Sequence, residues 1–373
     1  MASRSREVTS LNSWTTNIAS TRAWKMSCDI HVPFAISSET LDQANFVLVN
    51  IQDDNGLVGV GEASPFPTLT GDNINGVLPV AEEILDHLKE MTPIAALRYL
   101  RTIREETFTS SPSAYVGVEM ALWDLYGKQL GIPLAGIWGG RMYDKVTTDI
   151  TMPIMTPNTV ADFWALYKDH GFEVIKIKVS GHVSDDLDMI EALFKVVSRS
   201  TQVTLDGNQG YRLDDAKSLL ARLAELGTVP LFFEQPLPAD DWDGLKNLQD
   251  STGIPVCLDE TIITPEDAIR AVREKTAGMI NLKIMKSGIE ETSRIISIAR
   301  SAGIALMIGG MLESEIAMGC SLQLACGFGG IQHFDLDTPF FLKKFVCSDS
   351  PWHANSATLV RPSGPGLGLS LAT

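Results

Sequence analysis

Residues 174–179 read VIKIKV, residues 202–206 read QVTLD and residues 231–234 read LFFE. Each run is short and mainly apolar, and a stretch with helical spacing follows each of them. Five more runs have the same character: TTDIT (147–151), PVCLD (255–259), MINLK (279–283), IALMI (304–308) and IQHFD (331–335). Eight strand–helix units in one uninterrupted series predict an α/β fold, a parallel (β/α) barrel of the modified TIM type.

The segments between these runs have the features of barrel helices. LDDAKSLLARLAELG (213–227) and TPEDAIRAVREKT (264–276) show apolar residues at helical spacing, and several such segments open on Asp, Ser or Thr. An open, doubly wound sheet is the alternative. No glycine-rich fingerprint follows any of the strands, and eight units favour closure into a barrel.

The N-terminal part of the chain has a different pattern. NFVLVNI (45–51) and GLVGVG (56–61) predict an antiparallel hairpin, and helices are expected at about 78–91, 94–106 and 112–130. We therefore expect an α+β capping domain over residues 1–140 and a barrel over 141–344. The tail, residues 345–373, is rich in Pro, Gly and Ser and is expected to return to the capping domain.

The composition narrows the class of protein. A formal net charge of −16 speaks against a nucleic-acid partner, and no run approaches the ~18 apolar residues that a membrane span needs. The five cysteines form no CxxC pair and are expected to be buried free thiols. The first residues, MASRSREVTS, are a weak candidate for a targeting signal, because they are few and include Glu7. We expect a cytoplasmic protein, and a homo-oligomer because symmetric assemblies are common.

Ionisable residues stand where six of the eight strands end, which is the active-site face of such a barrel. Asp206, Glu234 and Asp259 close three consecutive strands. Three carboxylates held together in a barrel mouth repel one another unless a cation joins them, and oxygen ligands favour Mg²⁺. The sequence therefore predicts one magnesium ion on these three residues, with Asn208 and Glu260 beside its ligands.

Lysines occupy the same rim. Lys176 and Lys178 lie two apart on one strand, so both side chains point to one face, and the apolar alternation places that face inside the barrel. One ammonium and a bound cation would lower the pKa of the other lysine enough for it to act as a base. Lys283 ends the sixth strand, across the barrel from the second.

These groups predict the removal of a proton next to a carboxylate. A metal on the carboxylate oxygens would stabilise the resulting enediolate, while one lysine removes the proton and the other returns one to the opposite face. The outcome is racemisation or epimerisation, or elimination if a leaving group lies β to that carbon.

Motifs along nearly the whole chain carry a family resemblance. They are GVGEASPFPTLTGD (59–72), KIKVS (176–180), TLDGNQGY (204–211), FFEQPLP (232–238), CLDET (257–261), NLKIMKSG (281–288) and MIGGMLES (307–314). Together they resemble the muconate-lactonising subgroup of the enolase superfamily. FDLDTPFF (334–341) is similar to the pattern of the dipeptide epimerases within it.

The resemblance implies roles for single residues. Lys178 and Lys283 would be the two acid/base lysines, supported by Lys176, and Asp206, Glu234 and Asp259 would bind Mg²⁺. Asp335 and Asp337 would hold the α-ammonium of a dipeptide, and their i, i+2 spacing alone presents two acceptors to a cationic amine. Thr151, Gly310 and Leu312 fall at substrate-contact positions of the family.

One position departs from the relatives that accept an acidic second residue. They tend to carry a basic residue after the first strand of the capping domain, and Glu39 stands there in this chain. A carboxylate would repel a glutamate side chain and favour a cationic or hydrophobic one, so Ala-Glu is not the expected preferred substrate.

Several alternatives remain from the sequence. N-acylamino-acid racemase, o-succinylbenzoate synthase and muconate cycloisomerase would use the same scaffold, but their substrates lack a free α-ammonium for Asp335 and Asp337. A Schiff-base aldolase would use strand lysines without needing the three carboxylates. A binding protein without activity is a third class, which no feature of the sequence supports.

Overall fold

The structure, a computed structural model, describes residues 15–140, 142–198 and 200–372. The N-terminal stretch considered as a targeting signal lies outside these residues. Within them, no helix is both long and apolar enough to cross a membrane. All five cysteines are free and buried, as expected.

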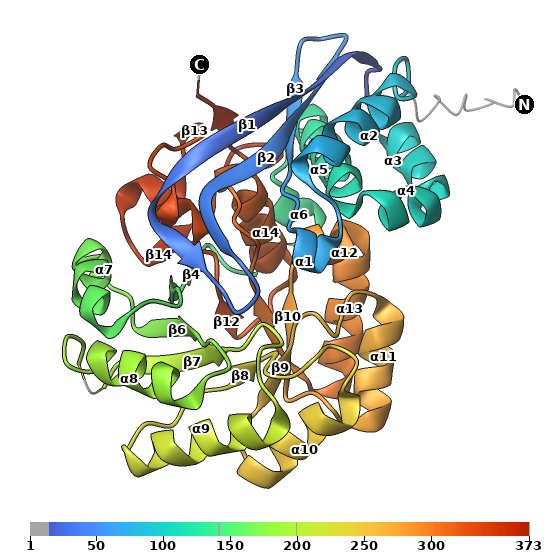
Figure 1. Cartoon of the computed structure of the whole chain (residues 1–373). Coiled ribbons are helices and arrows are strands. Elements are labelled where there is room, and N and C mark those ends of the chain that lie inside the picture. The colour runs from blue at the N-terminus through green and yellow to red at the C-terminus, as the bar shows by residue number, and fades with distance from the viewer. Residues whose placement is uncertain (1–14, 141, 199, 373) are drawn as a thin grey trace, which may run out of the picture.

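The capping domain begins with an antiparallel sheet in the order β1-β2-β3, and Figure 1 shows its helices beside that sheet. Its bounds are β1 Ile18–Ala35, β2 Thr40–Asp53, β3 Val58–Ala63, α1 Pro67–Thr70, α2 Ile74–Asp86, α3 Pro93–Thr102, α4 Arg104–Ser110, α5 Pro112–Leu130 and α6 Leu134–Ile137. The predicted hairpin is confirmed as β2 and β3, which pair from Val47 with Ala63 to Gln52 with Val58. The first expected helix is α2, which begins at Ile74 because Asn73 caps it.

Eight parallel strands form the second sheet, in the order β12-β11-β10-β9-β8-β7-β6-β5. The strands are β5 Ile150–Met152, β6 Val174–Lys178, β7 Gln202–Asp206, β8 Phe233–Glu234, β9 Val256–Leu258, β10 Met279–Leu282, β11 Ala305–Ile308 and β12 His333–Phe334. Their helices are α7 Val160–Tyr167, α8 Val183–Leu193, α9 Leu213–Glu225, α10 Trp242–Thr252, α11 Pro265–Glu274, α12 Ile284–Ser287, α13 Ile289–Ala302 and α14 Glu315–Phe328. Figure 1 shows α8–α11 and α13 outside the curled sheet, which confirms the predicted fold class.

The junction between the first and the last barrel strand differs from the expectation. The run at 147–151 is divided, because β4 (Lys145–Thr147) pairs instead with β14 (Thr358–Val360) in the tail. Only Ile150–Met152 then remains for the barrel. Among the described residues no ladder joins β5 to β12. The Asp149 N–H donates to the Phe334 carbonyl (2.9 Å), and the Leu336 N–H donates to the Thr148 hydroxyl (2.8 Å).

Buried polar contacts hold the capping domain on the barrel. Glu62 at the end of β3 accepts the Ser314 N–H (2.8 Å) at the start of α14. Glu119 of α5 accepts the Ile289 N–H (2.8 Å) at the start of α13, where a carboxylate also suits the helix dipole. In the tail, the Leu367 N–H donates to Asp124 of α5 (2.7 Å). The domain boundaries proposed from the sequence remain a prediction.

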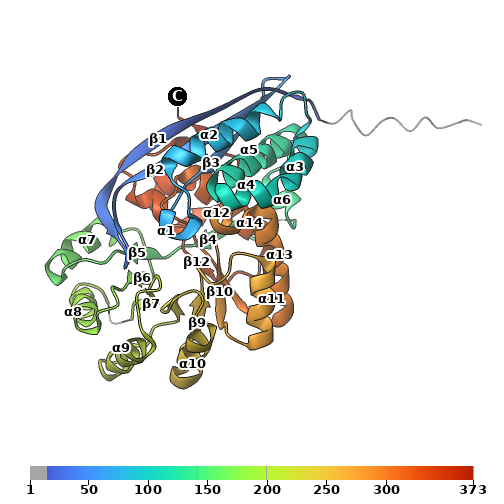
Figure 2. The ribbon, with the colours of Figure 1, turned by 45° about the vertical axis from the view of Figure 1, so that its right-hand side comes forward.

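These contacts fix the position of the β1–β2 hairpin relative to the strand ends. Figure 2 shows the hairpin curving from the cap down towards β5 and β6. At its tip the Ser37 hydroxyl donates to the Asn208 carbonyl (2.9 Å), and the Ile154 N–H donates to the Ala35 carbonyl (2.9 Å). The hairpin therefore covers the mouth of the barrel.

Candidate active site

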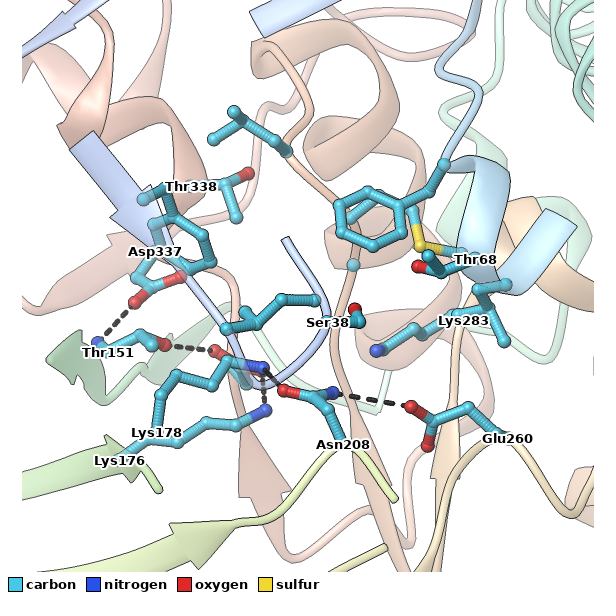
Figure 3. A pocket seen from close by; sticks show the side chains of 18 of the residues that line it. Ser38, Thr68, Thr151, Lys176, Lys178, Asn208, Glu260, Lys283, Asp337 and Thr338 are labelled. Atoms are coloured by element: carbon cyan, nitrogen blue, oxygen red, sulfur yellow. Dashed lines mark hydrogen bonds and ion pairs between the residues drawn. The ribbon is translucent and has the colours of Figure 1, made fainter. Parts of the chain in front are cut away.

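A cavity lies between the hairpin tip, α1 and the carboxyl ends of the barrel strands. It holds about 660 Å³ of empty space, including its open mouth. Figure 3 shows Lys176 and Lys178 on one side of it and Lys283 on the other. Three strands separate β6, which carries the first two lysines, from β10, which precedes the third.

Lys176 lies at the floor of this cavity, within a group of carboxylates. Its side chain is buried, and its Nζ is 2.9 Å from Asp206 Oδ2, 2.8 Å from Glu234 Oε2 and 2.8 Å from Asp335 Oδ2. Burial by itself lowers the pKa of Lys176, but the surrounding carboxylates outweigh it and hold the pKa well above the usual value. The three carboxylate contacts therefore hold the Lys176 side chain in place at this position.

The other two lysines each pair with one carboxylate. Lys178 Nζ donates to Asp206 Oδ2 (2.6 Å) and to Asn208 Oδ1 (2.9 Å). Lys283 Nζ donates to Asp259 Oδ2 (2.6 Å), and the attraction of Asp259 raises the pKa of Lys283 even though burial opposes this. For Lys176 and Lys283 the neighbouring carboxylates outweigh burial and raise the pKa. The lowering expected from the sequence, for one lysine of the Lys176–Lys178 pair beside a bound cation, remains a prediction.

The three predicted metal ligands follow one another along the rim. Asp206 on β7 is in register with Glu234 on β8, Asp259 follows β9 directly, and all three are fully buried. Burial and the charge of Asp206 raise the pKa of Glu234 to about 7. Burial also favours a higher pKa for Asp206, but the charges of Lys176 and Lys178 outweigh burial and lower the pKa of Asp206 to about 2.

The described residues place a different acidic group closest together. Asp149, Asp335 and Asp337 bring one carboxylate oxygen each within 4.8 Å of the others, and no other set of three acidic, His or Cys residues described here does so. The predicted metal ligands stand farther apart, since Lys176 Nζ lies between Asp206 and Glu234. Their all-oxygen donor set and full burial still suit a hard divalent cation.

Asp335 and Asp337 follow β12 and line the cavity. Asp337 Oδ2 accepts the Thr151 N–H (2.5 Å), and Asp335 Oδ1 accepts the Thr151 hydroxyl (3.3 Å). Asp337 Oδ1 is buried and accepts no hydrogen bond from the described part of the chain. Burial and the charge of Asp335 raise the pKa of Asp337 to about 8.

The remaining predicted residues are placed as follows. Thr151, Gly310 and Leu312 line the cavity, and so do Asn208 and Glu260, which are joined by a hydrogen bond of 3.3 Å from Asn208 Nδ2. Glu39 does not line it. It borders an adjoining groove and accepts a hydrogen bond from the Thr68 hydroxyl (3.0 Å).

Three residues with a place in this network were missed from the sequence. Asp149 adds a third carboxylate to the pair after β12. Asn281 Nδ2 donates to Glu234 Oε1 (2.7 Å), and Lys286 Nζ lies 2.9 Å from Asp259 Oδ1. Strand periodicity offered a signal for two of them, because Asp149 precedes Thr151 by two positions and Asn281 precedes Lys283 by two.

Two family models match most of the chain. Residues 18–139 match the mandelate racemase/muconate lactonizing enzyme N-terminal domain, and residues 158–373 match the enolase C-terminal domain-like family. An L-Ala-D/L-amino acid epimerase of Populus trichocarpa is 35% identical over 320 residues, covering 84% of this chain and 75% of that protein.

Solved structures show the same similarity over the full fold. The L-Ala-D/L-Glu epimerase of Bacillus subtilis, in a substrate-liganded complex, aligns with a TM-score of 0.90 at 30% identity, covering 96% of this chain and 100% of that one. A dipeptide epimerase of Enterococcus faecalis, complexed with Mg and L-Leu-L-Tyr, aligns with a TM-score of 0.87 at 29% identity, covering 95% and 99%.

Proposed function

Because this chain belongs to the mandelate racemase/muconate lactonizing enzyme family of the enolase superfamily, we propose that it is an isomerase that epimerises dipeptides with a free amino terminus. The relatives named above support this reaction class. The observation that carries the proposal is the buried acidic group beside the cavity.

Asp149, Asp335 and Asp337 make up that acidic group, and none of the three is appreciably exposed. Lys176 contacts one of the three, Asp335, and its ammonium is shared with Asp206 and Glu234. The group therefore has an excess of buried acceptors and an unpaired oxygen, Asp337 Oδ1, at the cavity. A substrate α-ammonium supplies both the positive charge and the N–H donors that are missing.

Lys178 and Lys283 are the acid/base pair in this proposal. Their Nζ atoms reach the cavity from β6 and from the end of β10, so a substrate α-carbon between them presents one face to each. One lysine takes the proton and the other delivers a proton to the opposite face, which inverts the centre. Lys176, tied to three carboxylates, positions charge under the substrate carboxylate and does not exchange protons.

Asp206, Glu234 and Asp259 are the residues that would hold Mg²⁺, and Asn281 and Lys286 orient two of them. When bound there, the ion supplies positive charge for the negative charge that develops on the substrate carboxylate. Lys178 and Lys283 each contact an outer member of this carboxylate set, so both bases lie next to the ion's position.

We expect Mg²⁺ to bind to the group formed by Asp206, Glu234 and Asp259 and not to the group that contains Asp337. Glu234→Gln should weaken Mg²⁺ binding by at least about tenfold, because a charged ligand is lost, whereas Asp337→Asn should leave it within about twofold. Calorimetric titration of Mg²⁺ into each protein measures this without reference to activity. The reverse pattern would place the metal on Asp149, Asp335 and Asp337 and contradict the assignment.

The function itself is tested by incubating a dipeptide library in D₂O with Mg²⁺ and measuring mass gain at the α-carbon. Deuterium uptake that is lost with EDTA is the expected result. N-acylamino acids and succinylbenzoate precursors serve as the comparison substrates, and exchange in these alone would favour the other activities of the superfamily. A covalent adduct trapped by borohydride would favour an aldolase.

Ala-Glu is not the preferred substrate in this proposal. Among the described residues no arginine or histidine lines the cavity, and Glu39 adds negative charge to the neighbouring groove. The cytoplasmic location and the homo-oligomeric state expected from the sequence also remain predictions.

A further inference from the structure

The wall of the cavity formed by the capping domain and the loop after β11 is apolar. It consists of Phe34, Ile36, Phe66, Leu69, Met311 and Leu312. Phe34 and Ile36 come from the end of β1 and the hairpin tip, while Phe66 and Leu69 belong to α1 and its N-cap. Ser38 and Thr68 are the polar side chains on the same cap segments, and both are exposed.

The opposite side of the cavity holds the charged groups. The lining cations among the described residues are Lys176, Lys178 and Lys283, and each lies within 3 Å of a carboxylate at the strand ends. None of them belongs to the capping domain. An acidic side chain of the substrate that lies against the cap wall would therefore lose its hydration without gaining a cationic partner.

The reaction geometry decides which substrate group meets the cap wall. The α-carbon to be inverted carries four groups: a proton, a carboxylate, the peptide nitrogen and a side chain. In the proposed function the proton faces one of the two lysines, the carboxylate faces Asp206, Glu234 and Asp259, and the peptide nitrogen leads towards Asp335 and Asp337. For both stereoisomers the remaining direction leads away from the barrel, towards the cap.

Glu39 does not offer a cationic side chain a partner inside this cavity. Its carboxylate accepts the Thr68 hydroxyl and borders the adjoining groove, and Phe66 and Leu312 line both spaces. The two apolar side chains therefore form the partition between the cavity and Glu39. A lysine or arginine side chain would have to pass them before reaching the carboxylate.

We propose, on the basis of the epimerase function above, that the second residue of the dipeptide carries an apolar side chain of the leucine or phenylalanine class. This side chain packs against Phe66, Leu69 and Leu312. Glu39 left two options for the second side chain, cationic or hydrophobic. The hydrophobic option is favoured, because in this arrangement the substrate side chain contacts the apolar wall and not the Glu39 carboxylate. Burial of a leucine or phenylalanine side chain supplies the favourable free energy.

The first test compares kcat/KM for L-Ala-L-Leu, L-Ala-L-Phe, L-Ala-L-Glu and L-Ala-L-Lys, which differ only in the second side chain. The leucine and phenylalanine substrates should exceed the other two by at least about tenfold, the usual scale for one hydrophobic contact in a pocket. Preference for the glutamate or lysine substrate would overturn the inference while leaving the epimerase function in place. Absence of α-proton exchange in every dipeptide would overturn both.

A second test introduces a cationic side chain into the capping-domain side of the cavity, which has none among the described lining residues. Ser38→Arg places a guanidinium on the exposed hairpin tip, where the substitution does not disturb the core. The ratio of kcat/KM for L-Ala-L-Glu to that for L-Ala-L-Leu should rise at least about tenfold. Ser38→Gln, which is long but uncharged, is the matched control and should keep the native order. An unchanged ratio in Ser38→Arg would contradict the position assigned to the side chain.

Discussion

Replacing either Lys178 or Lys283 by alanine is expected to lower the rate of epimerisation by at least about 10³-fold, because inversion needs an acid/base group on both faces of the α-carbon. The two lysines lie on opposite sides of the cavity, as Figure 3 shows, so neither can substitute for the other. Removal of the α-proton without inversion needs only one of the two lysines. Each variant should therefore still exchange the α-proton of one stereoisomer with solvent.

The measurement is deuterium uptake by the L,L and L,D forms of one dipeptide, alongside polarimetry for inversion. Lys178→Ala and Lys283→Ala should retain exchange with opposite stereoisomers, which assigns each lysine to one face. Lys217→Ala removes a lysine of α9 that bonds Asn247 at the surface and should behave like the parent protein. Exchange with the same stereoisomer in both variants would contradict the two-base arrangement.

Asp337→Asn is expected to lower kcat/KM for a free dipeptide by about 30-fold or more, the effect of removing one partner from a buried charge pair (about 2 kcal/mol). The amide keeps the size of the side chain and can still accept the Thr151 N–H through its oxygen. It loses the charge next to the unpaired Oδ1 position, where the substrate ammonium is proposed to bind.

The comparison substrate is the same dipeptide acetylated at its amino terminus. The kcat/KM of the parent protein for this acetylated dipeptide should be low, and Asp337→Asn should not lower it further. The ratio of kcat/KM for the free dipeptide to that for the acetylated one should therefore be smaller in Asp337→Asn than in the parent protein. Asp188→Asn on the exposed side of α8 is the control for loss of one negative charge. An equal loss for both substrates would show that Asp337 acts on the fold and not on the ammonium.

Position along a strand explains why much of this site could be predicted. A residue that ends a parallel strand lies at the same edge as the ends of its neighbours, whatever the loops do. Asp206, Glu234 and Asp259 therefore fall together, and the two-residue period places Lys176 and Lys178 on one face. The same reasoning failed for the run at 147–151, because pairing of β4 with the tail is a long-range contact that no local pattern reveals.

The positions of the loops and the charges of buried groups needed the tertiary structure. Glu39 was expected to face the substrate, but its direction depends on how the hairpin tip packs against α1, and there it bonds Thr68. The direction in which the pKa of a buried lysine shifts depends on how many carboxylates surround its ammonium, and no local pattern reveals that number. For Lys176 and Lys283 those carboxylates raise the pKa.

The sequence by itself determined the strand order of the barrel and the residues at its rim, since both follow from periodicity along the chain. Only the tertiary structure decided that Asp149 joins Asp335 and Asp337, that Lys176 stands between Asp206 and Glu234, and that the cap wall of the cavity is apolar. These are contacts between segments far apart in the chain. Their geometry is set by packing of the whole fold, to which many residues contribute weakly and together.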